Sequence, residues 1–151
     1  MDYEAVISRN SQQNKNEKDG LHILLISIHG LIRGENLELG RDADTGGQIK
    51  YVLELTRALA QQPEVAQVVL LTRRIDDAQI DDDYAQAVED LGDGARIVRL
   101  YAGPPDYLPT EPLWDHLDTF TDNALTYLRS TDALPDLVHS HYADGGYVGS
   151  R

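Results

Sequence analysis

Two short segments of the sequence hold residue types whose spacing could bind a ligand. In residues 42–50, Asp-Ala-Asp-Thr-Gly-Gly-Gln-Ile-Lys, a glycine pair stands at the start of a predicted helix. Gly46 and Gly47 carry no side chains, so the positive end of the helix and its N–H groups are open to an anion such as phosphate. The pair fits a simple tight turn equally well, and the Gly-x-Gly-x-x-Gly spacing of dinucleotide-binding proteins is absent.

The second segment, residues 139–146, reads His-Ser-His-Tyr-Ala-Asp-Gly-Gly and follows a predicted strand. Its two histidines are two residues apart, so in an extended chain they point the same way, with Asp144 just beyond them. A zinc site needs further ligands, and none stands at a suitable spacing. Imidazole and carboxylate groups are suited to binding sugar hydroxyls. The alternative, which the spacing alone slightly favours, places His139 in the core while His141 and Asp144 cap the next helix.

Charged residues and a tyrosine near two predicted loops form a third, less specific set of candidate binding residues. Arg73 and Arg74 close the second predicted strand, where they could meet an anionic ligand or simply offset the acidic residues that follow. Asp106, Tyr107 and Glu111 lie in or beside a proline-rich loop and could line a polar cleft, although turn formation explains them equally well.

The elements that must position these residues alternate between strands and helices. The predicted strands are residues 21–28, 65–72, 95–101 and 134–139. The predicted helices are residues 46–61, residues 112–129 and residues 143 to the end of the chain. The acid-rich residues 76–93 are expected to hold only a short solvated helix. This order predicts an α/β fold with a Rossmann-like, mostly parallel sheet and flanking helices, with ligands at the carboxyl ends of its strands.

Helical spacing also predicts which side chains point inward. The inward positions of the first helix are Ile49, Val52, Leu53, Leu59 and Ala60, and those of the second are Leu113, Leu117, Phe120, Ala124, Leu125 and Leu128. The strand at residues 95–101 alternates between apolar and polar side chains, so we expect it to be half exposed.

The composition excludes several classes of protein. The 151 residues have room for one domain with a core, and 26 acidic against 13 basic residues give a net charge of −13. That charge disfavours nucleic acid and anionic membranes as partners. Because there is no cysteine, neither a disulfide nor a thiolate metal site can form, and we expect a cytoplasmic protein without cofactor or metal. No apolar run is long enough to span a bilayer.

The pattern divides the chain into two parts. Residues 1–20 are polar, so we expect a mobile arm. Residues 21–151 are expected to form one domain. Because the chain ends inside the last predicted helix, we expect that domain to be truncated.

Five stretches taken together resemble the sucrose-phosphate synthase family, which are retaining glycosyltransferases of the two-domain GT-B architecture. The stretches are residues 27–34, 39–48, 71–75, 109–114 and 139–144. The resemblance implies part of the N-terminal, acceptor-side Rossmann-like domain, without the C-terminal donor-binding domain. It implies transfer of glucose from UDP-glucose to fructose 6-phosphate, which gives sucrose 6-phosphate and UDP.

The resemblance also implies roles for individual residues. The implied substrate-binding residues are Gly46, Gly47, Gln48, Arg73, His141 and Asp144. The two glycines would lie over the phosphates, Gln48 would bind fructose 6-phosphate, and Arg73 would lie at the edge of the cleft. The family's later catalytic residues have no counterpart in these 151 residues, so no catalytic residue is assigned and we expect the isolated chain to be inactive.

Two positions depart from the family pattern, because Pro105 and Thr110 stand where relatives commonly carry basic residues. Sucrose synthase and mannosylfructose-phosphate synthase share the fold and the glycine loop and are the alternative enzymes, although residues 33–41 favour the first assignment. An alternative of another class is a non-catalytic sugar-phosphate-binding or interaction module that pairs through an exposed sheet edge.

Overall fold

The structure is a computed structural model, and it describes residues 19–41, 46–131 and 134–151. Most of the predicted arm at residues 1–20 therefore lies outside the described residues. The strands are β1 (Leu21–Ile26), β2 (Val65–Arg73), β3 (Val88–Gly92), β4 (Ala95–Leu100) and β5 (Leu137–Ser140). The helices are α2 (Gly47–Ala60), α3 (Thr110–Leu113), α4 (Leu117–Ser130) and α5 (Tyr142–Gly149), with 3-10 turns η2 (Asp82–Ala85) and η3 (Trp114–His116).

The strands form one sheet in the order β3-β4-β2-β1-β5. β1 pairs in parallel with both β2 and β5, β4 pairs in parallel with β2, and only β3 is antiparallel among the described strands. The predicted mostly parallel sheet is confirmed. The chain crosses from β1 to β2 on one side of β1 and later returns to β5 on its other side, so the direction of strand addition reverses between β1 and β5. Ligands of open α/β sheets bind at such a reversal, outside the carboxyl ends of the strands.

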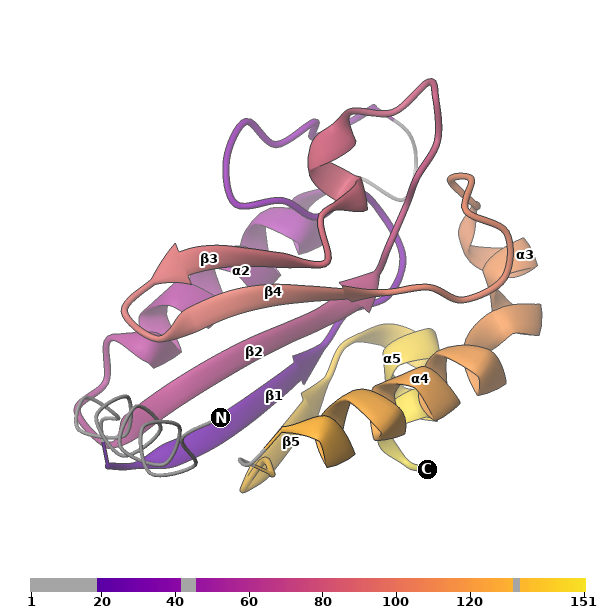
Figure 1. Cartoon of the computed structure of the whole chain (residues 1–151). Helices are drawn as coiled ribbons and strands as arrows, with labels where there is room; N and C mark the ends of the chain where they lie inside the picture. The colour runs from indigo at the N-terminus through magenta and orange to yellow at the C-terminus, as the bar shows by residue number, and fades with distance from the viewer. Residues whose placement is uncertain (1–18, 42–45, 132–133) are drawn as a thin grey trace, which may run out of the picture.

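The alternation of side chains in the central strands builds two core layers, one on each face of the sheet. Ile23 and Leu25 of β1 pack with α2 on one face, and Leu24 and Ile26 pack with α4 and α5 on the other (Figure 1). The inward face predicted for α2 is confirmed for four of its five positions, and Leu59 is half-buried. Each fully buried leucine or isoleucine stabilises the fold by about 1.5–3 kcal/mol.

The predicted second helix is divided, because η3 separates α3 from α4. Leu113 lies in α3, and the buried face of α4 is Leu117, Phe120, Thr121 and Ala124. Leu125 is 37% exposed, so its predicted inward position is wrong. Thr121 takes the buried place beside it, because its hydroxyl donates to the carbonyl of Leu117 at 2.8 Å.

The prediction of only a short solvated helix at residues 76–93 is wrong. The segment holds η2 and the antiparallel strand β3, which a turn with positive φ at Gly92 and Gly94 connects to β4. Acidic side chains fit this strand because Asp90 faces solvent while the half-buried Glu89 binds Arg99. That pairing leaves Arg99 only 2% exposed, so the expectation that its strand is half exposed is also wrong.

β5 and α5 complete the described chain. β5 begins at Leu137, later than predicted, and its first three residues are exposed because it lies at the edge of the described sheet. α5 begins at Tyr142 and ends at Gly149, whereas the sequence predicted a helix that continues to the end of the chain. Among the described residues, no helix is long and apolar enough to cross a lipid bilayer.

Candidate functional site

A buried pair of side chains joins the loop that follows β1 to the first turn of α5, which follows β5, at the point where strand addition reverses. Nδ1 of His29 lies 2.7 Å from Oδ2 of Asp144, and the two side chains are 6% and 1% exposed. The pair links residues that are 115 positions apart in the sequence. It therefore fixes the second predicted segment against the end of the central strand.

Asp144 is held from two sides. Its other oxygen, Oδ1, accepts the backbone N–H of Gly145 at 2.8 Å, and it lies in the first turn of α5, where the helix dipole favours a negative charge. A carboxylate only accepts hydrogen bonds, so Nδ1 of His29 is the nitrogen that donates to it. The carboxylate thereby sets the orientation and the tautomer of the His29 ring.

Tyr142 adds backbone strain beside the pair. It has φ of 61°, a left-handed conformation that costs a residue other than glycine about 1–3 kcal/mol, and its ring contacts His29 edge-on with 5.0 Å between centroids. Such strain persists where the surrounding structure holds it in place and is common at ligand sites.

His141 presents a buried ring nitrogen. The residue is 8% exposed, and its Nε2 has no hydrogen-bond partner among the described residues. Its ring stacks on that of His139 with 4.6 Å between the ring centroids. The Tyr51 ring of α2 lies edge-on to it, with 6.0 Å between centroids. Burial lowers the pKa of His141, and the neighbouring His139 lowers it further, so the ring is neutral at pH 7. A neutral, buried imidazole nitrogen is suited to a sugar hydroxyl.

The sequence left open an alternative for residues 139–146, in which His139 packs in the core while His141 and Asp144 cap α5. The structure differs from this alternative. His139 is exposed rather than buried in the core. His141 occupies the N-cap position of α5 without a side-chain capping bond, and Asp144 binds His29 as well as its own helix.

The glycine pair marks the amino end of α2. Gly46 is the N-cap residue in an extended conformation without a side-chain capping bond, and Gly47 is exposed. Neither has positive φ, and a Cβ added to either would meet no described atom within 4 Å. Neither the backbone angles nor the described neighbours therefore require glycine at these positions. Space for a ligand next to the helix end is the reason for glycine that these observations favour. Asp44 and Thr45, which precede the pair and are residue types that commonly cap helices, lie outside the described residues.

Gln48 connects the same helix end to β1. Its Nε2 donates to Oγ of the buried Ser27 at 3.1 Å. The end of β1 therefore holds both predicted segments, one through Ser27 and the other through His29. Gln48 and Asp144 contact this strand end through Ser27 and His29, and the N–H of His141 donates to the carbonyl of Ile26 at 2.9 Å. Gly46 and Gly47 directly precede Gln48 in the chain. Figure 1 shows the amino end of α2 and the start of α5 at the carboxyl end of β1.

Arg73 stands apart from this group, at the end of β2. Its Nε donates to the carbonyl of Ala102 at 2.9 Å, Nη1 donates to the carbonyl of Asp106 at 2.9 Å, and Nη2 donates to the carbonyl of Pro104. The side chain is 3% exposed, and burial lowers the pKa of Arg73. All three nitrogens thus bind backbone carbonyls and hold the proline-rich loop.

Sequence reasoning missed Ser27 and His29 as site residues, and it missed Tyr51. Ser27 and His29 were detectable because they are polar residues directly after a buried strand, where α/β folds bind ligands. Tyr51 carried no such signal, because it is one of several residues on the polar side of a helix.

A cavity of about 360 Å³ opens next to Asp144 between α4 and α5. Its lining residues are Trp114, Leu117, Asp118, Ala143, Asp144 and Tyr147. A larger cavity of about 870 Å³ lies at the opposite edge of the sheet, beside the β3–β4 turn, away from the carboxyl ends of the strands. Within the described parts of the chain, no three His, Asp or Glu side chains are grouped so that they could hold a metal ion.

Comparison with known proteins places this geometry in a family. Residues 19–151 match the family model described as the sucrose synthase first GT-B domain. The chain belongs to this sucrose synthase GT-B family. The resemblance to sucrose-phosphate synthases and the predicted fold, a first GT-B domain, are thereby confirmed.

Similar members of the sucrose synthase GT-B family are named as sucrose-phosphate synthases. The chain is 45% identical to probable sucrose-phosphate synthase 4 of Oryza sativa subsp. japonica, over 90% of this chain and 15% of that protein. It is 42% identical to sucrose-phosphate synthase of Zea mays, over 93% of this chain and 15% of that protein. The solved sucrose-phosphate synthase of Thermosynechococcus elongatus is 30% identical, with a TM-score of 0.66, over 86% of this chain and 29% of that chain. The chain thus spans about 15% of the length of these curated relatives.

Proposed function

We propose that this chain is acceptor-side sequence of a sucrose-phosphate synthase. In that reaction glucose passes from UDP-glucose to fructose 6-phosphate with retained anomeric configuration, and the products are sucrose 6-phosphate and UDP. The names of the relatives support the proposal. The observation that carries it is the buried His29–Asp144 pair beside the open amino end of α2, at the reversal of strand order.

The phosphate groups bind at the amino end of α2. The first N–H groups of a helix have no partner within the helix, and the helix dipole adds positive potential there. Gly46 and Gly47 leave these groups open from the solvent side. Positioned N–H donors that stabilise charge on a departing diphosphate are an effective electrostatic contribution to glycosyl transfer.

The sugar hydroxyls bind to the polar groups around β1 and β5. Gln48 and the buried Nε2 of His141 bind fructose 6-phosphate, and His29 is held beside them by Asp144. Arg73 contributes at the edge of the cleft through the loop that it holds.

The donor sugar requires groups that these 151 residues do not supply, so the chain alone binds the acceptor without transferring glucose. The relatives are longer, since the chain spans about 15% of the length of probable sucrose-phosphate synthase 4 of Oryza sativa subsp. japonica. The expected compartment is the cytoplasm, which the absence of cysteine suits.

Isothermal titration of this chain with fructose 6-phosphate and with fructose tests the proposal. We expect fructose 6-phosphate to bind about tenfold more tightly, because a phosphate adds charge-assisted hydrogen bonds. Gly47→Ala should weaken that binding without harming the fold, because the added methyl group meets no described atom. Gly92→Ala, at the opposite edge of the sheet, is the control and should leave binding unchanged.

Three results would oppose the proposal. Absence of binding to either sugar would refute an acceptor site, and a preference for unphosphorylated fructose would favour a sucrose synthase instead. Formation of sucrose 6-phosphate by the isolated chain would refute the expectation that it is inactive.

A further inference from the structure

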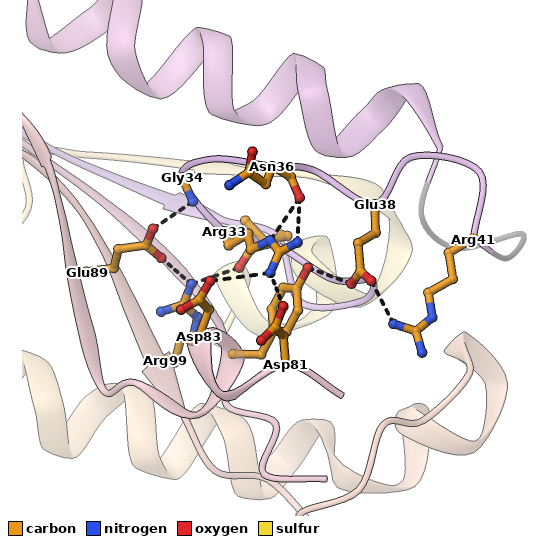
Figure 2. A network of polar contacts seen from close by, with 11 residues as sticks. Arg33, Gly34, Asn36, Glu38, Arg41, Asp81, Asp83, Glu89 and Arg99 are labelled. Atoms are coloured by element: carbon orange, nitrogen blue, oxygen red, sulfur yellow. Dashed lines mark hydrogen bonds and ion pairs between the residues drawn. The ribbon is translucent and has the colours of Figure 1, made fainter. Parts of the chain in front are cut away.

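Three arginines hold residues 31–41, the loop that follows β1 and leads towards the glycine pair. Arg33 belongs to this loop, and Arg57 and Arg99 bind it from α2 and β4. Figure 2 shows Arg33 and Arg99 with their carboxylate partners Asp81, Asp83 and Glu89. Together with Arg57, which donates to the carbonyl of Gly34, we call these residues the arginine brace. Its members come from α2, β3, β4, η2 with its flanking residue, and the loop itself. The brace therefore connects the loop to elements on several sides.

Arg33 is the centre of the brace. It is 8% exposed, and its Nε and Nη2 donate to the carbonyl of Asn36 at 3.0 and 2.6 Å. Its Nη1 donates to Asp81 at 2.8 Å and to Asp83 at 3.3 Å. The guanidinium also lies 5.1 Å above the Tyr84 ring. One side chain thus binds its own loop and the acidic segment that the sequence pattern suggested was only solvated.

Gly34 is the point where the loop meets the sheet and α2. Its N–H donates to Oε1 of Glu89 at 2.8 Å, and its carbonyl accepts Nη2 of Arg57 at 2.6 Å. A Cβ at this position would lie 2.7 Å from that Glu89 oxygen, so glycine permits the close approach. The other Glu89 oxygen accepts Nη2 of Arg99, which also donates to the carbonyl of Ile32 at 2.9 Å.

The far end of the loop is tied to the same acidic segment. The Tyr84 hydroxyl donates to Glu38 at 2.9 Å, and Arg41 donates to Glu38 at the same distance. Arg41 is the last described residue before the short stretch 42–45 that leads to Gly46. The loop is therefore held at Arg33 and again at Glu38, up to the last described residue before the glycine pair.

We propose that Arg33 is a positioning residue for the binding site: held by Asp81 and Asp83, it fixes residues 31–41, and the placement of that loop influences Gly46 and Gly47 at the amino end of α2. The inference rests on the proposed function, because it treats the amino end of α2 as the place where the phosphate binds. Without the brace the competent arrangement of the glycine pair is populated less often, and the apparent dissociation constant rises in proportion.

The variant Arg33→Gln tests this on the 151-residue chain. We expect the amide NMR signals of Gly46 and Gly47 to shift or broaden while those of β1 and β2 stay in place, and the dissociation constant for fructose 6-phosphate to rise roughly tenfold. Arg129→Gln is the control, because it removes the same charge at an exposed position in the last turn of α4, away from residues 31–41. It should change that constant by less than about twofold.

A second variant guards against loss of folding in Arg33→Gln. Asp81→Ala with Asp83→Ala removes the carboxylate partners, whose side chains are 62% and 53% exposed, and leaves the buried guanidinium in place. If the Gly46 and Gly47 signals are unchanged in both variants, Arg33 does not position the site. If the unaltered chain binds no fructose 6-phosphate, the proposed function fails, and those two signals still decide the positioning role.

Discussion

Removing the carboxylate of Asp144 is the most direct test of the pair that joins β1 to β5. The two oxygens of Asp144 accept from Nδ1 of His29 and from the N–H of Gly145, and its side chain is 1% exposed. Asp144→Ala removes the carboxylate that accepts from both donors. The contact that fixes α5 against the end of β1 is lost with it.

The size of the effect follows from these two donors. An unsatisfied buried donor costs about 1–3 kcal/mol, so two of them cost about 2–6 kcal/mol. Removing a buried charge also relieves its own desolvation penalty, which offsets part of this loss. We therefore expect the free energy of unfolding to fall by about 2–4 kcal/mol.

The matched control is Asp118→Ala in the neighbouring helix. Asp118 accepts the Tyr147 hydroxyl at 2.7 Å, but that contact is exposed, so its loss should cost less than about 1 kcal/mol. A double-mutant cycle with His29→Ala should give a coupling of about 1–2 kcal/mol between His29 and Asp144, because they are in direct contact.

Urea denaturation followed by the fluorescence of Trp114, the only tryptophan, and by circular dichroism measures these values. Equal losses for Asp144→Ala and Asp118→Ala would show that the pair adds nothing beyond an exposed contact. A coupling below about 0.3 kcal/mol would likewise refute the reasoning.

Two further predictions concern a turn and a titrating side chain. Gly92 and Gly94 have φ of +83° and +85°, but only at Gly94 would a Cβ collide with a described atom, at 2.7 Å from the Ala66 carbonyl oxygen. Gly94→Ala should therefore lower the unfolding free energy by about 1–3 kcal/mol more than Gly92→Ala, and equal losses in thermal or urea unfolding would contradict this. Burial and His139 lower the pKa of His141 below its ordinary 6.5, so the folded chain binds fewer protons there than the unfolded chain. This contribution to stability is present above about pH 6.5, the unfolded pKa, and is lost as the pH falls from there through the lower folded pKa. His141→Asn should therefore flatten the loss of stability below about pH 6.5, and an unchanged pH slope would count against it.

The fold was predictable where the apolar residues of a segment follow a single pattern, either a continuous run or helical spacing. Central strands such as β2 are nearly continuous apolar runs, because helices or loops cover both faces of the sheet there. The buried residues of α2 recur at helical spacing in the sequence. The acid-rich residues 76–93 were not predictable, because their place in the sheet depends on partners far away in sequence. Glu89 enters β3 only because Arg99 and Gly34 bind it, and no local pattern shows those contacts.

The candidate site was predictable by residue type, but its contacts were not. Spacing predicted a cluster at His141 and Asp144, but not that Asp144 would be paired with His29 across 115 positions. Arg73 shows the same limit: a cation at a strand end suggested a ligand, but the sequence could not show that three backbone carbonyls accept from it. A sequence pattern indicates which groups are polar, whereas a distant contact decides whether such a group is still available.

The shortness of β5 has a consequence for the dynamics of the site. Among the described strands β5 pairs only with β1, through four residues, and both Leu137 and Val138 are largely exposed. Few buried contacts hold it, so it should open by local fluctuation far more readily than the centre of the sheet. Its backbone amides would then exchange with deuterium early, and a sugar phosphate that bridges both strand ends would slow that exchange.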